Sequence, residues 1–96
     1  MAKLTVQVRT RDDLLQLLSA NESAAWVIAQ GREKDITHVQ IVNFNGTQMI
    51  EGIFDRNESL RQAGGRLVLR FMDGRIVNSA VTVTFDGQNP VRYIEG

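Results

Sequence analysis

The sequence contains no cysteine and only one histidine and one proline among its 96 residues. Without cysteine the chain cannot form disulfide bonds, thiolate zinc sites, iron–sulfur clusters or a cysteine nucleophile. A single histidine, His38, argues against a histidine-rich metal site and against a Ser-His-Asp triad. We therefore expect no metal and no cofactor.

An excess of charge of one sign is also missing, because 11 lysines and arginines balance 11 acidic residues. Proteins that bind nucleic acid non-specifically are usually strongly basic, so the zero net charge disfavours this class of partner. No apolar run approaches the ~18 residues that span a bilayer, and no signal-peptide core is present. We expect a cytoplasmic protein that does not associate with membranes.

The remaining composition is that of an ordinary folded protein. Hydrophobic residues make up 43% of the chain and charged residues 23%, both close to the averages for soluble domains. The length allows one hydrophobic core. We expect residues 1–96 to form a single domain.

The first third of the chain predicts a strand, a helix and a third apolar element. Leu4, Val6 and Val8 alternate with polar residues, as in a half-buried strand. Residues 11–20 carry a leucine-rich face and predict a short amphipathic helix, with Thr10 as its N-cap and Asn21 at its left-handed C-terminus. Residues 24–29 form either a buried strand or a second short helix, and their Trp, Val and Ile side chains favour the strand.

Three Asn-Gly or Asp-Gly pairs occur in the rest of the chain. Both residues of such a pair tolerate positive φ, which makes the pair the strongest short signal for a hairpin turn. The pairs predict turns at residues 45–46, 73–74 and 86–87. These turns separate strands over residues 37–44, 47–54, 66–72, 75 onward and 91–94, whereas residues 57–65 form a loop or one helical turn.

Together these elements predict an α+β fold in the order β-α-β-β-β-β-β-β. Strands joined by tight turns must be antiparallel, so we expect a mainly antiparallel sheet of six or seven strands with one short amphipathic helix packed on it. The apolar pattern changes phase between Ile76 and Val81, which implies a bulge at residues 78–80. Because bulges bend strands, we expect the sheet to be curved.

Both faces of this sheet carry apolar residues. Val39, Ile41 and Ile50 share the expected core face of the first hairpin, yet its opposite face also contains bulky apolar side chains. An antiparallel sheet with one solvated face shows clean alternation instead. One short helix cannot cover two faces, so the second face is buried by a roll of the sheet, by a second copy or by a ligand.

This second face leads to our functional hypothesis, a small non-enzymatic interaction or assembly module. We expect it to form a homodimer or to bind a protein partner through Val42, Phe44, Met49, Ile53, Arg66, Val68, Arg70, Met72, Arg75 and Val77. The alternative is that Arg66, Arg70 and Arg75 bind nucleic acid or another anionic ligand, because guanidinium groups suit phosphate and carboxylate. A third hypothesis is an enzyme in which Glu51 supports His38 as a general acid or base.

Overall fold

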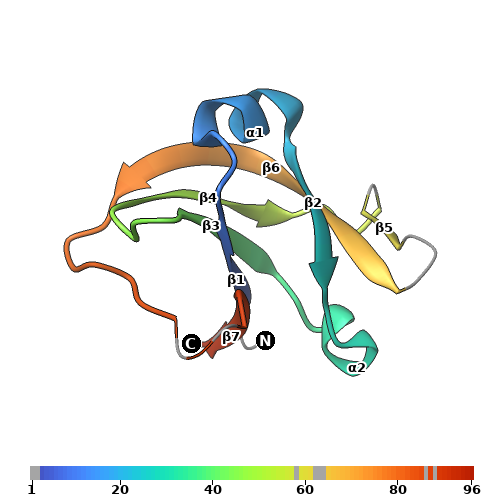
Figure 1. The fold of residues 1–96 in the computed structure, drawn as a ribbon. Coiled ribbons are helices and arrows are strands. Elements are labelled where there is room, and N and C mark those ends of the chain that lie inside the picture. Colours follow the sequence, from blue (N-terminus) through green and yellow to red (C-terminus); the bar gives the residue numbers. More distant parts are fainter. Residues whose placement is uncertain (1–2, 58, 62–64, 86, 88) are drawn as a thin grey trace.

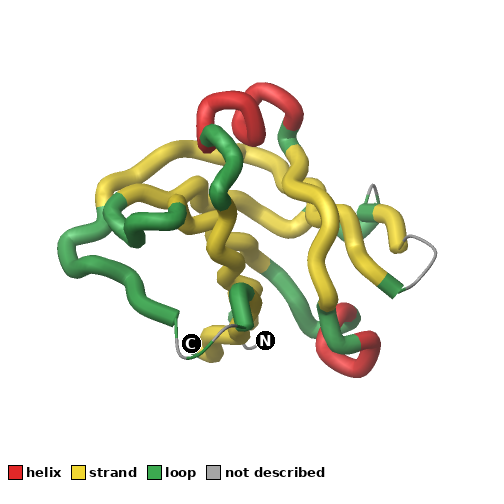
Figure 2. Tube along the Cα trace, viewed as in Figure 1, coloured by secondary structure: helices red, strands yellow, loops and turns green. Residues whose placement is uncertain are grey.

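A computed structural model of the protein describes residues 3–57, 59–61, 65–85, 87 and 89–96. The first half comprises β1 (Leu4–Thr10), α1 (Leu14–Ala20), β2 (Glu22–Val27), α2 (Gln30–Glu33) and β3 (His38–Asn43). The second half comprises β4 (Gln48–Phe54), β5 (Leu60–Arg61), β6 (Arg66–Asn78) and β7 (Val91–Glu95). Strands dominate the molecule, as Figure 2 shows, and the expected α+β class is confirmed.

The strands form one curled sheet in the order β2-β6-β4-β3-β1-β7, with β5 also paired to β6 (Figure 1). Neighbouring strands are antiparallel except for β1 and β3. These two strands run parallel because the connection between them contains α1, β2 and α2 and crosses from one end of the sheet to the other. The curl brings the two outermost strands together, and the Ala29 amide beyond β2 donates to the Tyr93 hydroxyl of β7 at 3.0 Å.

Helix α1 is shorter than expected at its N-terminus. It begins at Leu14, because the Asp13 carboxylate accepts from the Leu15 amide and caps the helix. Thr10 instead remains in β1, so its expected role as the N-cap is wrong. Asn21 ends the helix at φ 57°, the left-handed conformation that its sequence position predicted.

The segment after α1 contains the strand favoured by its Trp, Val and Ile residues. Its continuation, the four-residue α2, was not predicted, since residues 31–35 read as a charged connection. In residues 57–65 the structure contains the two-residue strand β5, where we expected a loop or a helical turn. Residues 58 and 62–64 of that segment lie outside the described residues.

The hairpin predicted at Asp73-Gly74 is wrong, whereas the one at Asn45-Gly46 is confirmed. Strand β6 continues through residues 73–74, which together oppose the single residue Gly52 of β4. This is a β-bulge, and Asp73 adopts φ 54° in it. A bulge inserts one extra residue, so side chains on its two sides change from odd to even positions while keeping the same face of the sheet. A two-residue turn at 73–74 would have the same effect on which residues share a face. Phe71 and Ile76 therefore both face the core, as predicted, although they lie on one strand.

The strand expected beyond residue 80 is also absent. Strand β6 ends at Asn78, and the described residues from 79 to 90 form a loop that leads to β7. The expected bulge at residues 78–80 is therefore wrong. Curvature accompanies two other bulges, at Asp73-Gly74 of β6 and between Ser23 and Trp26 of β2.

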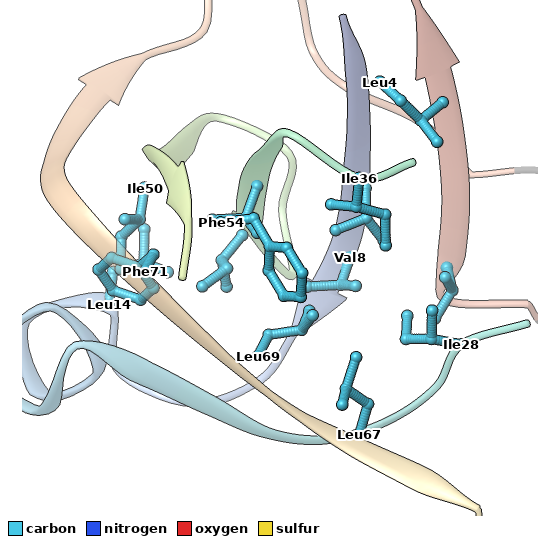
Figure 3. Close-up of a cluster of buried hydrophobic side chains, with 14 residues drawn as sticks. Leu4, Val8, Leu14, Ile28, Ile36, Ile50, Phe54, Leu67, Leu69 and Phe71 are labelled. Carbon is cyan, nitrogen blue, oxygen red and sulfur yellow. The ribbon is translucent and has the colours of Figure 1, made fainter. Parts of the chain in front are cut away.

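The core fills the concave inner face of the curled sheet. Figure 3 shows side chains from β1, β4 and β6 meeting there with Leu14 of α1 and with residues that flank α2. The fully or almost fully buried members of this core include Val6, Val8, Ile28, Ile36, Val39, Ile41, Ile50, Leu67, Leu69 and Phe71. A Cβ on Gly74 would lie 2.4 Å from the Phe71 ring, so glycine at the bulge allows this ring to pack closely.

Candidate functional site

The convex outer face of the sheet carries the alternate residues of the same strands. Cross-strand pairing arranges them in rows that run from β7 through β1, β3 and β4 to β6. Three neighbouring rows differ in the chemistry of their side chains.

The central row is polar and continuously bonded, and we call it the amide row. It consists of Arg92, Gln7, Gln40, Glu51 and Arg75, one residue from each of five strands. Arg92 Nε donates to Gln7 Oε1 at 2.5 Å, and Gln7 Nε2 donates to Gln40 Oε1 at 2.8 Å. Gln40 Nε2 donates to Glu51 Oε2 at 3.1 Å, and Arg75 completes the row at 3.9 Å from Glu51. The polar groups of this face are thus satisfied by one another.

The next row, which we call the apolar row, contains Ile94, Thr5, His38, Ile53 and Met72. Three of its apolar side chains remain exposed, at 39% for Ile94, 40% for Ile53 and 46% for Met72. A hollow of about 310 Å³ lies where this row meets the amide row. Its rim contains charges of both signs from Lys3, Glu51, Asp73 and Arg75.

On the other side of the amide row, Val42, Met49 and Val77 form a third row. Val42 is fully buried and Met49 is 8% exposed, although no helix covers the outer face here. The loop after β6 passes this end of the sheet, and the Val83 amide donates to the Gly46 carbonyl at 2.9 Å. These two predicted contact residues are therefore covered within the chain.

The remaining predicted residues lie on the first half of β6, which pairs with β2 and β5 instead of β4. Val68 is buried, and Arg70 NH1 forms an ion pair with Glu22 Oε1 at 2.5 Å. Arg66 and Arg75 are nine residues apart, which corresponds to about 30 Å along a strand. The three arginines of the expected anionic site are therefore spread along β6 and do not converge on one ligand.

Arginine and aromatic side chains gather instead at the end of the outer face near the β3–β4 turn. The Arg11 and Arg9 guanidiniums lie 4.5 and 5.0 Å from the centre of the Phe44 ring. Arg9 also lies 5.4 Å from the centre of the Phe85 ring, and Arg92 lies 4.8 Å from it. We call these five residues the arginine–phenylalanine stack, in which cations and rings alternate.

The residues of the enzymatic hypothesis both line the hollow, but they have other partners. His38 Nδ1 lies 2.8 Å from Thr37 Oγ1, whereas Glu51 bonds with Gln40 and Arg75. A metal ion has no group of three His, Cys, Asp or Glu side chains to bind among the described residues. Glu58, an acidic residue that follows Glu51 and Asp55 in the sequence, lies outside the residues that the structure describes.

A second hollow, of about 410 Å³, lies beside α2, and half of its eight lining residues are basic. Two of these residues hold the local structure together. Arg56 donates to the carbonyl oxygens of Glu33 and Ile36, and Arg32 contacts Glu95 at 3.6 Å and the Tyr93 ring at 4.8 Å. Their positive charge is therefore used to attach α2 to the sheet.

Comparison with known proteins adds no relative from which a role could be transferred. No protein-family model matches the chain, and no curated protein or solved structure matches it either. Within the described residues no helix has the length and apolar character needed to span a membrane.

Sequence reasoning missed Gln7 and Arg92 of the amide row and Arg9 and Arg11 of the stack. The register of the Asn45-Gly46 hairpin placed Gln40 on the same face as Glu51, but Gln40 was not among the predicted contact residues. It gave no information on β1 and β7, whose pairing partners are far away in the sequence. The one available signal was that Gln7 and Arg9 alternate with the apolar residues of β1 and so had to share its second face.

Proposed function

We propose that this protein is a non-enzymatic assembly module that forms a homodimer through the outer face of its sheet. The observation that carries the proposal is the apolar row, in which Ile53 and Met72 are direct cross-strand neighbours and both are substantially exposed. Ile94 is also exposed, at the other end of the row beyond the polar residues His38 and Thr5. Covering these side chains would remove apolar area from water, which is the main driving force for association.

The amide row beside it lowers the cost of this association. Burying a polar group is expensive when the group loses its hydrogen bonds to water without replacement. Gln7 and Gln40 already bond to each other and to the charged residues that flank them. A partner can therefore lie over the row without having to supply matching polar groups.

The charges around the hollow favour a second copy as the partner. Lys3 and Arg75 lie on the same rim as Glu51 and Asp73, so the surface carries both signs. In a two-fold contact the same patch meets itself, and each basic group can face an acidic group of the other copy. The zero net charge of the chain adds no long-range repulsion between copies. The proposal places this association in the cytoplasm.

The test is the molar mass in solution of the wild-type chain and of the Met72→Asp variant, measured by light scattering after gel filtration over a range of concentrations. We expect a wild-type dimer and a folded, monomeric variant, because the new carboxylate would be buried in the interface. Leu15→Asp is the matched control, since Leu15 is 67% exposed on α1, which contributes no residue to the apolar row. A wild-type monomer at all concentrations, or equal dissociation of both variants, would refute the proposal.

A further inference from the structure

We propose that the arginine–phenylalanine stack binds single-stranded nucleic acid. This site shares Arg92 with the amide row and lies on the opposite side of that row from Ile53 and Met72. Arg32, Arg61, Arg70 and Arg75 form ion pairs with acidic residues. The three arginines of the stack instead have rings and neutral polar groups as their neighbours.

The stack carries a local positive charge. Three guanidiniums gather around two rings, at separations over which salt at physiological concentration screens them only partly. Two acids follow Arg11 directly in the sequence. Asp13 turns its carboxylate to the Leu15 amide as a helix cap, and Asp12 takes part in none of the ion pairs of the described residues. Like charges placed together in this way repel one another, and an anionic ligand would relieve that repulsion.

The side chains of the stack are ordered before any ligand binds. Arg92 is fixed by the Gln7 side chain at 2.5 Å and by the Thr84 carbonyl at 2.9 Å. Arg9 lies between the two rings, while Arg11 is exposed at the end of the stack. Because the side chains are held in place before a ligand arrives, binding loses less conformational entropy than it would with free arginines.

The aromatic rings favour single-stranded nucleic acid over other anions. Arg9 and Arg11 already lie over the half-exposed Phe44 ring, so the surface open to a base is the exposed guanidinium of Arg11, which this ring supports. Unpaired bases stack on arginine guanidiniums as well as on aromatic rings, regardless of sequence. A duplex presents mainly phosphates, and an acidic peptide presents carboxylates, so neither would use this stacking surface. With a net charge of zero, phosphate contacts alone would be too weak, and stacking has to contribute.

The experiment is a titration of the full chain into a labelled oligothymidine of about 12 nucleotides, followed by fluorescence anisotropy at several salt concentrations. Contacts with three phosphates predict that log K falls against log salt with a slope of about −2. The competing probes are a duplex of the same length and polyaspartate. We expect both to bind at least tenfold more weakly than the single strand.

Two variants separate the charge from the stacking. Arg11→Gln should reduce the salt slope by about 0.7, because it removes one phosphate contact. Phe44→Leu keeps an apolar side chain and should lower the affinity roughly tenfold while leaving the slope unchanged. Lys34→Gln removes an equal charge from an exposed lysine at the end of α2, which belongs to neither site, so it should leave the binding within twofold of wild type.

The proposal is overturned if the oligothymidine does not bind saturably, if duplex or polyaspartate binds as tightly, or if Lys34→Gln weakens binding as much as Arg11→Gln. Circular dichroism of each variant checks that the fold is retained. Met72→Asp should bind the oligonucleotide like wild type, so failure of the dimer and failure of this site give different results.

Discussion

The inner and outer faces of the sheet are made of alternate residues of the same strands, yet they are organised differently. The inner face is mainly apolar, and any close-packed set of side chains with the right volume would serve it. The outer face is divided into an apolar row, an amide row and a third row beside which a loop passes. The first two of these rows exist only if five strands are aligned in one register. The inner face thus stabilises the fold, whereas the outer face depends on its precise alignment.

The largest difference between the faces should appear at two isoleucines of β4. Ile50 is fully buried on the inner face, and Ile53 is 40% exposed on the outer face. Ile50→Ala should reduce the free energy of unfolding by about 2–5 kcal/mol, because it leaves a cavity. Ile53→Ala should reduce it by about 1 kcal/mol or less. Urea denaturation at concentrations where the chain is monomeric measures both, and equal losses would contradict the distinction between the faces.

A smaller effect is expected where the loop is attached to the outer face. Gly46 has φ 74°, and a Cβ there would lie 2.2 Å from the Val83 carbonyl oxygen. Gly46→Ala should therefore cost about 2 kcal/mol from the strained backbone and the displaced loop. Faster hydrogen exchange of the Val83 amide would show that the loop has moved.

Gly87→Ala provides the matched control for this prediction. Gly87 has a similar φ of 62°, but its Cβ would meet no atom within 4 Å. The substitution should cost only the backbone strain, about 1 kcal/mol. If it accelerated exchange at Val83 as strongly as Gly46→Ala, close contact between the turn and the loop would not be the cause.

An effect of similar size is expected in the amide row. Gln40→Met should cost about 1–3 kcal/mol, because it leaves the buried Gln7 amide without its acceptor, whereas Gln7→Met should cost less, because Gln40 is half-buried and keeps its bond to Glu51. The double variant should cost less than the two single losses together, since no amide is left unsatisfied. A double-mutant cycle from urea denaturation measures this coupling. Additive losses would mean that the two amides contribute independently of each other.

Much of the fold could be predicted because local signals agree with tertiary structure. The alternation of β1, the Asn45-Gly46 turn and the left-handed Asn21 are all determined by a few neighbouring residues. Asp73-Gly74 misled the prediction because positive φ at an Asp-Gly pair suits a bulge as well as a turn. The pair forms a bulge and not a turn when β4 is long enough to pair with the continuation of β6.

Less of the candidate site could be predicted. Met72, Ile53 and Arg75 were placed on the second face because hairpin register and strand period determine their orientation. The amide row and the arginine–phenylalanine stack were missed because they require β1 to lie between β3 and β7. That arrangement follows from the total packing of the sheet, and no short segment of the sequence encodes it.

The position of β1 between β3 and β7 also affects the order in which the chain can fold. Gln7 meets Gln40 across 33 residues of sequence and Arg92 across 85. Bringing such distant segments together loses much chain entropy before any contact is gained, which slows folding. On the ribosome, β1 is made before both of its neighbours and has to wait for β7 with one edge unpaired. This interval is when the nascent chain is most exposed to mispairing with another strand.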